Sequence, residues 1–341
     1  MLRARNYNPA VKHGAKWIPR DIVGGGGLLT SGEVYWVDGS NGADTNDGLD
    51  NLSSFATIQA AVTAATRNDV ILVRPKAMAS GATDPTDYAE TIIIPATHDG
   101  LSIFGLGDRT QGGLPQIKIG AGSTAMLTVR APGVSIANLG FNGASSTGGG
   151  ILLDDDGSTK TAFGWSVINC HFKNCKGATA TDASTGGAIQ WAATGGAWQG
   201  YAGYNRFYKN VGDIVLKNTS ESVPQDIVIE HNEFSGPASS TDVNLYLRGV
   251  GGSGINGVVI RDNTFSAMPA LTSGATKRYV ELTGCVGIMA NNYFASIVSP
   301  TGSEVTFASN GTGGIVPATV FMASNWGETT TTGETGEIFR T

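Results

Sequence analysis

The sequence predicts an all-β protein built as a single-stranded parallel β-helix, and three observations support this fold class. A short phrase of alternating apolar residues, ending in a turn residue and an aromatic residue, recurs at steps of 27 to 35 residues. A second short strand follows each copy, and clusters of Gly, Ser, Thr and Asn separate the strands. A period in this range indicates a solenoid or a propeller, and a four-stranded propeller blade needs roughly 40–45 residues. A Gly-rich β-sandwich with coincidental spacing is the alternative.

The first strand of each copy leads into a turn whose residue type is repeated. The turn residue and the aromatic residue two positions later are Leu139 and Phe141, Cys170 and Phe172, Asn205 and Phe207, Asn232 and Phe234, Asn263 and Phe265, and Asn292 and Phe294, with a degraded copy at Asn325. Asn tolerates the left-handed backbone region, and stacked amides can hydrogen-bond along a rod. We therefore predict that Asn232, Asn263 and Asn292 stack on successive coils, with their phenylalanines stacked alongside.

The second strand of each copy has a period of two. Apolar residues flank one variable residue in the segments 151–153, 189–191, 214–216, 245–247, 280–282 and 305–307. In a strand of this kind the flanking pair faces the core and the middle residue faces outward. The predicted outer row is Leu152, Gln190, Val215, Tyr246, Glu281 and Thr306.

Composition agrees with a turn-dense β protein. The chain has 341 residues with 49 Gly, and only 15% of residues are charged and 8% aromatic. The apolar share of 40% is enough for a long core, which argues against disorder. Three cysteines form no disulfide framework, and Cys170 is expected to be a buried filler. No apolar run reaches the length of a membrane span and no signal peptide is visible, so no membrane partner is expected.

The chain divides into an arm, a cap, a rod and a tail. Residues 1–32 form the arm, which ends in a flexible joint at Gly24 to Gly27. Residues 33–69 are the predicted cap, in which Ser53 or Ser54 begins an amphipathic helix over residues 55–65 that covers the exposed end coil. Residues 70–326 are the β-helix, and residues 327–341 are the extended tail.

The arm is strongly basic. Its first twenty residues contain Arg3, Arg5, Lys12, Lys16 and Arg20 and no acid, a charge of +5. The remainder carries 22 − 5 = 17 basic and 28 acidic residues, a net charge of −11. This asymmetry predicts that residues 1–20 dock on an acidic partner. We expect them to contact a neighbouring chain, because they have no apolar period of their own.

Segments 35–49 (YWVDGSNGADTNDGL), 55–62 (FATIQAAV) and 69–73 (DVILV) resemble the entry to pectate-lyase-like β-helix proteins. This resemblance implies a right-handed helix. It leaves the function open, since that superfamily contains lyases, hydrolases, epimerases, tailspikes and inert rods. The opening segment 1–17, with a β-helix behind it, resembles tailed-bacteriophage virion proteins.

Motifs for a metal or for acid–base chemistry are weak. The acidic run Asp154, Asp155 and Asp156 is interpreted as a solvated turn, with a metal or catalytic cluster as the alternative. The spacing of Asp44, Asn46 and Gly48 echoes a calcium loop but lacks the distal Glu, so Asx-type turn bonds explain it better. His171 and His231 flank the turn position and are interpreted as structural. No metal and no cofactor is therefore expected.

The outer row of the second strands contains the best candidate for sugar cleavage. Residues two positions before this row are Asp213, Asn244, Tyr279 and Glu304, and residues two positions after it include Lys217 and Arg248. Coils lie about 4.8 Å apart, so Glu281 and Glu304 would have glycosidase-like separations of roughly 5–10 Å, beside Tyr246 and Tyr279. The alternative, which we prefer, is a subunit interface formed by Leu152, Val215, Tyr246 and Tyr279.

Together these features predict a bacteriophage virion structural protein. It would decorate the capsid or form a short spike, anchored to other virion proteins through residues 1–20. A homotrimer is expected, because elongated rods associate side by side under closed symmetry. The alternative is a tailspike that binds or cleaves host polysaccharide, and a second alternative is a polysaccharide lyase or hydrolase. No nucleic-acid partner is expected.

Overall fold

The computed structural model describes most of the chain in a series of segments. They are residues 10–13, 16–19, 32–80, 86–107, 113–119, 125–143, 148–157, 161–176, 187–191, 197–217, 224–235, 243–249, 254–266, 278–297, 314–329 and 335–337.

Within these residues the strands form three long sheets, and each coil between Val70 and Ile315 contributes one strand to each. The first sheet contains β3 (Val34–Val37), β4 (Val70–Val73), β7 (Ser102–Gly105), β10 (Ser135–Ala137), β13 (Ser166–Ile168), β16 (Tyr201–Gly203), β19 (Val228–Glu230), β22 (Ile255–Arg261), β25 (Cys285–Ala290) and β28 (Val320–Ala323). The second contains β5 (Tyr88–Ala89), β8 (Gln116–Lys118), β11 (Gly140–Asn142), β14 (His171–Lys173), β17 (Arg206–Tyr208), β20 (Glu233–Ser235), β23 (Thr264–Ser266), β26 (Tyr293–Ile297), β29 (Trp326–Thr329) and β30 (Thr335–Glu337). The third contains β6 (Ile92–Ile94), β9 (Ala125–Val129), β12 (Gly149–Leu153), β15 (Ile189–Trp191), β18 (Gly212–Lys217), β21 (Val243–Arg248), β24 (Arg278–Glu281) and β27 (Gly314–Ile315).

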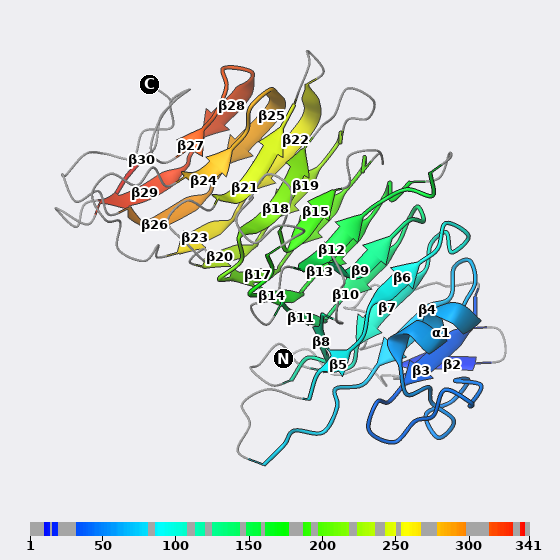
Figure 1. Ribbon diagram of the computed structural model, residues 1–341. Coiled ribbons are helices and arrows are strands. Elements are labelled where there is room, and N and C mark those ends of the chain that lie inside the picture. Colours follow the sequence, from blue (N-terminus) through cyan, green and yellow to red (C-terminus); the bar gives the residue numbers. More distant parts are fainter. Residues whose placement is uncertain are drawn as a thin grey trace, which may run out of the picture.

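The pairing between coils is parallel. Phe141 pairs with Phe172, Phe172 with Phe207, and Phe207 with Phe234 in successive strands of the second sheet. Figure 1 shows the resulting elongated body, with β3, β4 and α1 at one end and β28 and β29 at the other. The fold is thus an all-β parallel solenoid, as predicted, and the sandwich alternative is wrong. Its right-handedness stays a prediction.

The interior contains the two predicted rows. The rings of Phe141, Phe172, Phe207, Phe234, Phe265 and Phe294 stack in order, with centroids 4.5–5.1 Å apart. Beside them the amides of Asn205, Asn232, Asn263, Asn292 and Asn325 are hydrogen-bonded from coil to coil. Cys170 is buried at the equivalent turn position, and its backbone N–H donates to the Asn205 side chain at 2.8 Å. The predicted stacking is therefore confirmed.

The left-handed backbone conformation does not belong to the ladder asparagines, contrary to the prediction. The left-handed residue is the one before the ladder position, with φ between 51° and 60°; these residues are Asn138, Asn169, Tyr204, His231, Asp262, Asn291 and Ser324. They stand at the corner between the first and second sheets, and none of them is buried. The ladder asparagines do not adopt the left-handed conformation. Asn is therefore favoured at this position by the hydrogen bonds that its side-chain amide makes between coils.

The helix α1 (Ile58–Ala64) is shorter than predicted. Thr57, rather than Ser53 or Ser54, is its N-cap and accepts a hydrogen bond from the Ala60 N–H at 3.1 Å. The Glu90 carboxylate accepts from the N–H groups of Ile58 and Gln59 at 3.0 and 2.9 Å. Burial is the largest influence on Glu90 and raises its pKa. These long-range bonds explain the later start, since they satisfy the first N–H groups at Ile58.

The helix lies against the N-terminal end of the solenoid. It buries Ile58, Ala61 and Val62 and contacts β3, β4 and β6. Its role as a cover for the end coil stays a prediction. No helix among the described residues is long and apolar enough to cross a membrane.

The two chain ends differ partly from expectation. In the arm, β1 (Ala10–His13) and β2 (Lys16–Pro19) pair antiparallel with each other. Arg3 and Arg5 lie outside the described residues. At the other end β30 pairs antiparallel with β29, so the second sheet continues into the segment expected to be a tail.

Candidate functional site

The predicted outer row of the third sheet exists. Leu152 pairs with Gln190, Gln190 with Val215, Val215 with Tyr246, and Tyr246 with Glu281. The row then continues to Ile315 and not to Thr306. Glu304 and Thr306 lie outside the described residues, so the proposed pair of Glu281 and Glu304 is not described. In this row of described residues Glu281 is the one carboxylate.

The row is not an exposed apolar stripe. Val215 and Tyr246 are only 2% and 6% exposed, although they lie outside the main core cluster, and Leu152 is half-buried. Little of the Val215 or Tyr246 side chain is left to contact a second chain. Their role at a subunit interface stays a prediction.

Three residues assigned to the neighbouring outer row, Asp213, Asn244 and Tyr279, face the interior. The Tyr279 ring packs edge-on against Phe265 and Phe294, at 5.8 and 5.4 Å between centroids. Asp213 is buried and accepts hydrogen bonds from the amides of Asn210 and Asn244, at 2.8 and 2.6 Å. These residues follow the corner between the second and third sheets. Strict alternation belongs to a straight strand and fails there, so their predicted outward placement is wrong.

Glu281 has basic and hydroxyl neighbours. Thr283 Oγ1 lies 3.5 Å from its carboxylate. Arg248 donates to the Tyr246 hydroxyl at 3.0 Å. That bond, and the charge of Glu281, raise the pKa of Arg248. This is one acid beside one cation, without a second carboxylate in the described row, so it provides no acid–base pair of the glycosidase type.

The acidic motifs form turns and ion pairs. Asp154 accepts from Arg130 at 2.9 Å, and Asp155 accepts from the Gly157 N–H at 2.7 Å. Asp44 accepts from the N–H groups of Ala56 and Thr57, both at 2.9 Å. No group of three or more metal-ligating side chains occurs among the residues that the structure describes. The Asp155 bond to Gly157, two residues on, is of the Asx type. Asp44 instead bonds residues twelve and thirteen positions later, so the Asx-type interpretation is wrong for Asp44.

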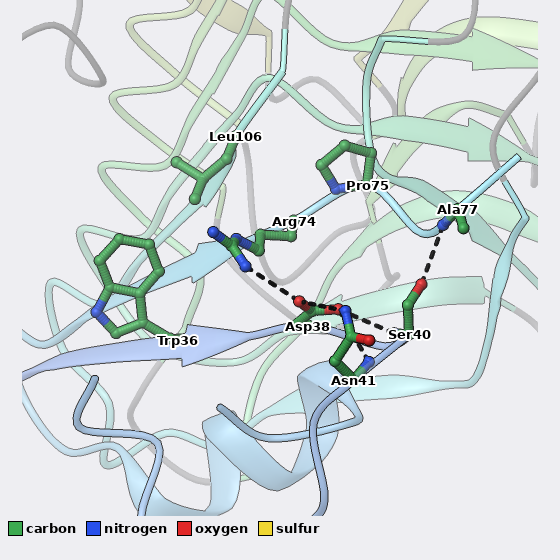
Figure 2. Close-up of a pocket in the computed structure, with 8 residues that line it drawn as sticks. All are labelled: Trp36, Asp38, Ser40, Asn41, Arg74, Pro75, Ala77 and Leu106. Atoms are coloured by element: carbon green, nitrogen blue, oxygen red, sulfur yellow. Dashed lines mark hydrogen bonds and ion pairs between the residues drawn. The ribbon is translucent and has the colours of Figure 1, made fainter. Parts of the chain in front are cut away.

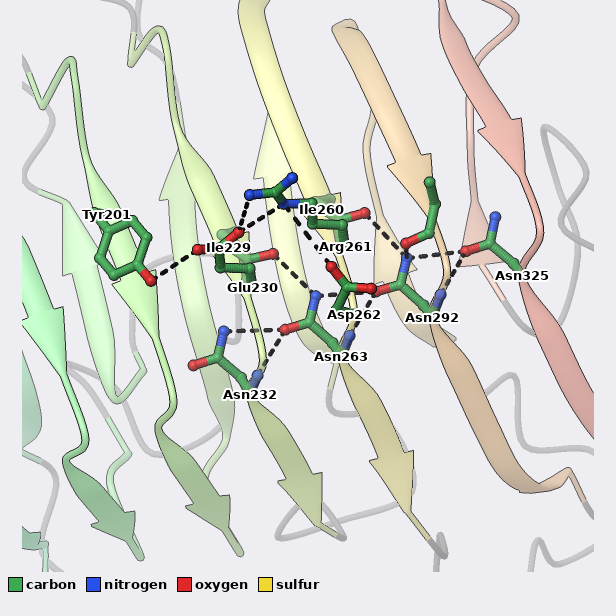
Figure 3. Close-up of polar contacts among 11 residues, drawn as sticks. Tyr201, Ile229, Glu230, Asn232, Ile260, Arg261, Asp262, Asn263, Asn292 and Asn325 are labelled. Atoms are coloured by element: carbon green, nitrogen blue, oxygen red, sulfur yellow. Dashed lines mark hydrogen bonds and ion pairs between the residues drawn. The ribbon is translucent and has the colours of Figure 1, made fainter. Parts of the chain in front are cut away.

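A polar cluster that the sequence did not predict lies on the outer wall of the first sheet (Figure 3). The Tyr201 hydroxyl donates to Glu230 Oε1 at 2.9 Å, and Arg261 Nε donates to Glu230 Oε2 at 2.6 Å. Gly203 makes room for this arrangement, because a Cβ there would lie 2.6 Å from the Tyr201 ring. Glu230 and Arg261 occupy equivalent positions of successive repeats, and opposite charges at that spacing were the signal available in the sequence.

The charges of this cluster balance one another. Burial raises the pKa of Glu230, but hydrogen bonds from Tyr201 and Arg261 and the Arg261 charge outweigh it and lower that pKa overall. Burial, and the hydrogen bond and charge of Glu230, raise the pKa of the Tyr201 hydroxyl. Glu230 is therefore held as a carboxylate at neutral pH, which suits binding and not proton donation.

Aromatic side chains stand next to this cluster. Tyr204 and His231 follow one another at the corner, and their rings stack 4.8 Å apart. Tyr204 is 45% exposed. On the adjoining wall of the second sheet Arg206 forms an ion pair with Glu233 at 2.8 Å, and Tyr208 is exposed. The rings of Tyr204, His231 and Tyr208 thus lie beside charged groups at this corner.

A cavity of about 500 Å³ lies near the N-terminal end (Figure 2). Arg74 donates to Asp38 Oδ2 at 3.1 Å, and Asp38 also accepts from the N–H groups of Ser40 and Asn41. Burial raises the pKa of Asp38, but bonds from Asn41, Ser40 and Arg74 lower it overall. The remaining lining residues are Trp36, Pro75, Ala77 and Leu106. Every oxygen of Asp38 is already engaged by the chain, so this cavity presents no reactive acid.

No family model matches the chain, and no curated protein matches it. Among solved structures, a GH136 lacto-N-biosidase from Eubacterium ramulus is similar, with 12% identity over 87% of this chain and 67% of that one and a TM-score of 0.31. A pectin methylesterase from Aspergillus niger is 13% identical over 87% of this chain and 86% of that one, with a TM-score of 0.30. Likenesses at this level carry no argument about function.

Proposed function

We propose that this protein is a structural rod of a bacteriophage particle, decorating the capsid or forming a short spike, and anchored through its basic N-terminal arm. The supporting observation is the continuity of its interior. The Asn row from Asn205 to Asn325 and the Phe row from Phe141 to Phe294 pass from coil to coil without a break. Such stacks couple each coil to the next and suit a rigid scaffold.

The outer acids support a non-catalytic role. Glu230 pairs with Arg261, Glu233 with Arg206, and Asp154 with Arg130. A catalytic acid is usually tuned towards neutral pH by burial or a like charge. The pKa of Glu230 is shifted in the opposite direction, because its cationic and hydroxyl partners lower it.

The test is attachment to particles. Phage particles purified by density gradient should contain the full-length chain in a fixed ratio to the capsid or tail proteins. Removal of residues 1–20 should abolish incorporation and leave the rod folded. A chain that occurs only in the particle-free fraction would contradict the proposal. Light scattering of the purified chain tests the proposed homotrimer, which a monomer at micromolar concentration would exclude.

Polysaccharide binding is a second candidate, and the corner between the first and second sheets favours it. Tyr204, His231 and Tyr208 present rings there beside the ion pair of Arg206 and Glu233. In affinity electrophoresis with host surface polysaccharide, Tyr204→Ala should weaken retardation, whereas Leu52→Ala, at a 91% exposed site far from the corner, should not.

Cleavage is a separate outcome of the same mixture. We expect no release of reducing ends and no unsaturated sugars absorbing in the ultraviolet. If product forms and Glu281→Gln removes it without unfolding the rod, the protein is a polysaccharide lyase or hydrolase. The structural proposal then fails.

A further inference from the structure

The outward face of the first sheet carries a second apolar cluster at its N-terminal end. We name it the outer apolar patch; it consists of buried Val34, Val70, Leu72, Phe104 and Ala137, with partly buried Trp36, Leu106 and Ile168 packed against them. Its residues alternate with Ile71 and Ile103, which belong to the main core. The patch therefore lies on the outside of the solenoid, on the wall next to the cavity of Figure 2.

The patch is more deeply buried than the other end of the same wall. Val70 is 1% and Leu72 0% exposed, although both face away from the core. Further along the row of Val70, at the other end of the same wall, Ile288 is 46% and Phe321 67% exposed. Neighbouring strands thus leave an outward apolar side chain open to solvent. Trp36, Leu106 and Ile168 cover part of the N-terminal end of the wall, and a segment that packs on it from beyond the sheet would complete the cover.

The N-terminal segment fits this role. Strands β1 and β2 pair only with each other among the described strands, and an isolated two-stranded hairpin is marginally stable in water. Residues 10–19 include Val11, Trp17 and Ile18, so the hairpin has apolar residues to bury.

The connection is long enough. The described chain resumes at Gly32, directly before β3 at the edge of the patch. Residues 20–31 can span about 40 Å when extended. The five strands that carry the patch, β3, β4, β7, β10 and β13, cover only about 20 Å at a spacing of about 4.8 Å.

We propose that residues 10–19 dock on the outer apolar patch of their own chain. The same chain is favoured over a second copy because Val70 and Leu72 are already buried within one chain. This goes beyond the proposed function, and it differs from the expectation, based on charge alone, that all of residues 1–20 contact a neighbour. Residues 1–9, with Arg3 and Arg5, would remain to reach a partner.

Limited proteolysis of the full chain tests the docking. Trypsin cleaves after Lys12 and Lys16, and docking should protect both bonds. Phe104→Glu, and independently Ile168→Glu, should raise the cleavage rate at these bonds about tenfold or more. The reason is that the cleavage rate is proportional to the fraction of molecules in which residues 10–19 are undocked. The matched control is Ile288→Glu on the exposed end of the same wall, which should leave the rate unchanged. Equal cleavage in the wild type and in both patch variants, with an unchanged melting temperature, overturns the proposal.

A cross-link distinguishes the two sources of the hairpin. Trp17→Cys combined with Leu106→Cys should form a disulfide within one chain, seen as a faster monomer band on a non-reducing gel. Trypsin protection should also persist on dilution. A dimer band, or protection that disappears on dilution, would assign the patch to the arm of a second copy and overturn docking in the same chain.

Discussion

Asn263 accepts two hydrogen bonds from Asn232 on the preceding coil, from the backbone N–H at 2.9 Å and from the side-chain amide at 3.0 Å. The amide of Asn263 donates in turn to the Ile229 carbonyl at 2.9 Å and to Asn292 Oδ1 at 3.0 Å. All four partners are protein groups, and Asn263 is buried. A fully satisfied polar row in a low-dielectric interior both stabilises the stack and specifies its register.

Asn263→Ala should destabilise the rod by about 2–4 kcal/mol, because the buried backbone N–H of Asn232 loses its acceptor and the Ile229 carbonyl loses a side-chain donor. Asn292 Oδ1 keeps only the bond from the backbone N–H of residue 263. Urea unfolding followed by circular dichroism measures the change. Asn256→Ala, at an exposed position of β22, is the matched control and should alter stability by less than about 0.5 kcal/mol. Equal effects of the two substitutions would mean that the ladder contributes nothing.

Phe234→Ala should cost about 3–5 kcal/mol, because it opens a cavity in a stack whose ring centroids lie 5.0 and 4.7 Å from Phe234. Thermal and urea unfolding report this loss. Phe321→Ala removes the same side chain at a 67% exposed site and should be nearly neutral. If both variants unfold alike, the stack is not a source of stability.

Glu230 should make stability depend on acid pH. Its pKa in the folded protein lies below the value of about 4.3 for an unfolded chain, so its contribution is present above that pH and is lost as pH falls through the folded pKa. The difference in unfolding free energy between the wild type and Glu230→Gln should therefore be largest near neutral pH and shrink below about pH 4. A difference that stays constant from neutral to acid pH would show that the carboxylate charge is not involved.

Gly203→Ala should disrupt the cluster around Glu230 without touching it. The new Cβ would lie 2.6 Å from the Tyr201 ring, so the ring must move and its hydroxyl must leave Glu230. Carbon-13 NMR titration should then show a higher pKa for Glu230. Tyr201→Phe, which removes only the hydroxyl, should shift the pKa in the same direction. An unchanged pKa in both variants would show that the Tyr201 hydroxyl does not lower the pKa of Glu230.

The sequence by itself determined the interior of this protein. Inward positions follow from alternation within a strand, and the same phrase is copied along the chain. The stacked rows of Phe234, Phe265 and Phe294 and of Asn232, Asn263 and Asn292 were therefore predictable from one repeat unit. The sandwich alternative, in contrast, was excluded only by the parallel pairing of successive coils in the structure.

Only the tertiary structure decided what happens at corners, at the ends and on the outer walls. Turns of variable length determine which residues of adjacent coils lie side by side, so Glu281 meets Ile315 rather than Thr306. The corner before β24 points Tyr279 inward. Glu230 can accept hydrogen bonds from Tyr201 and Arg261 only when three coils are stacked in register. Outward side chains lie under weaker packing constraints than the core, and their partners are therefore set by the assembled coils, not by the repeat.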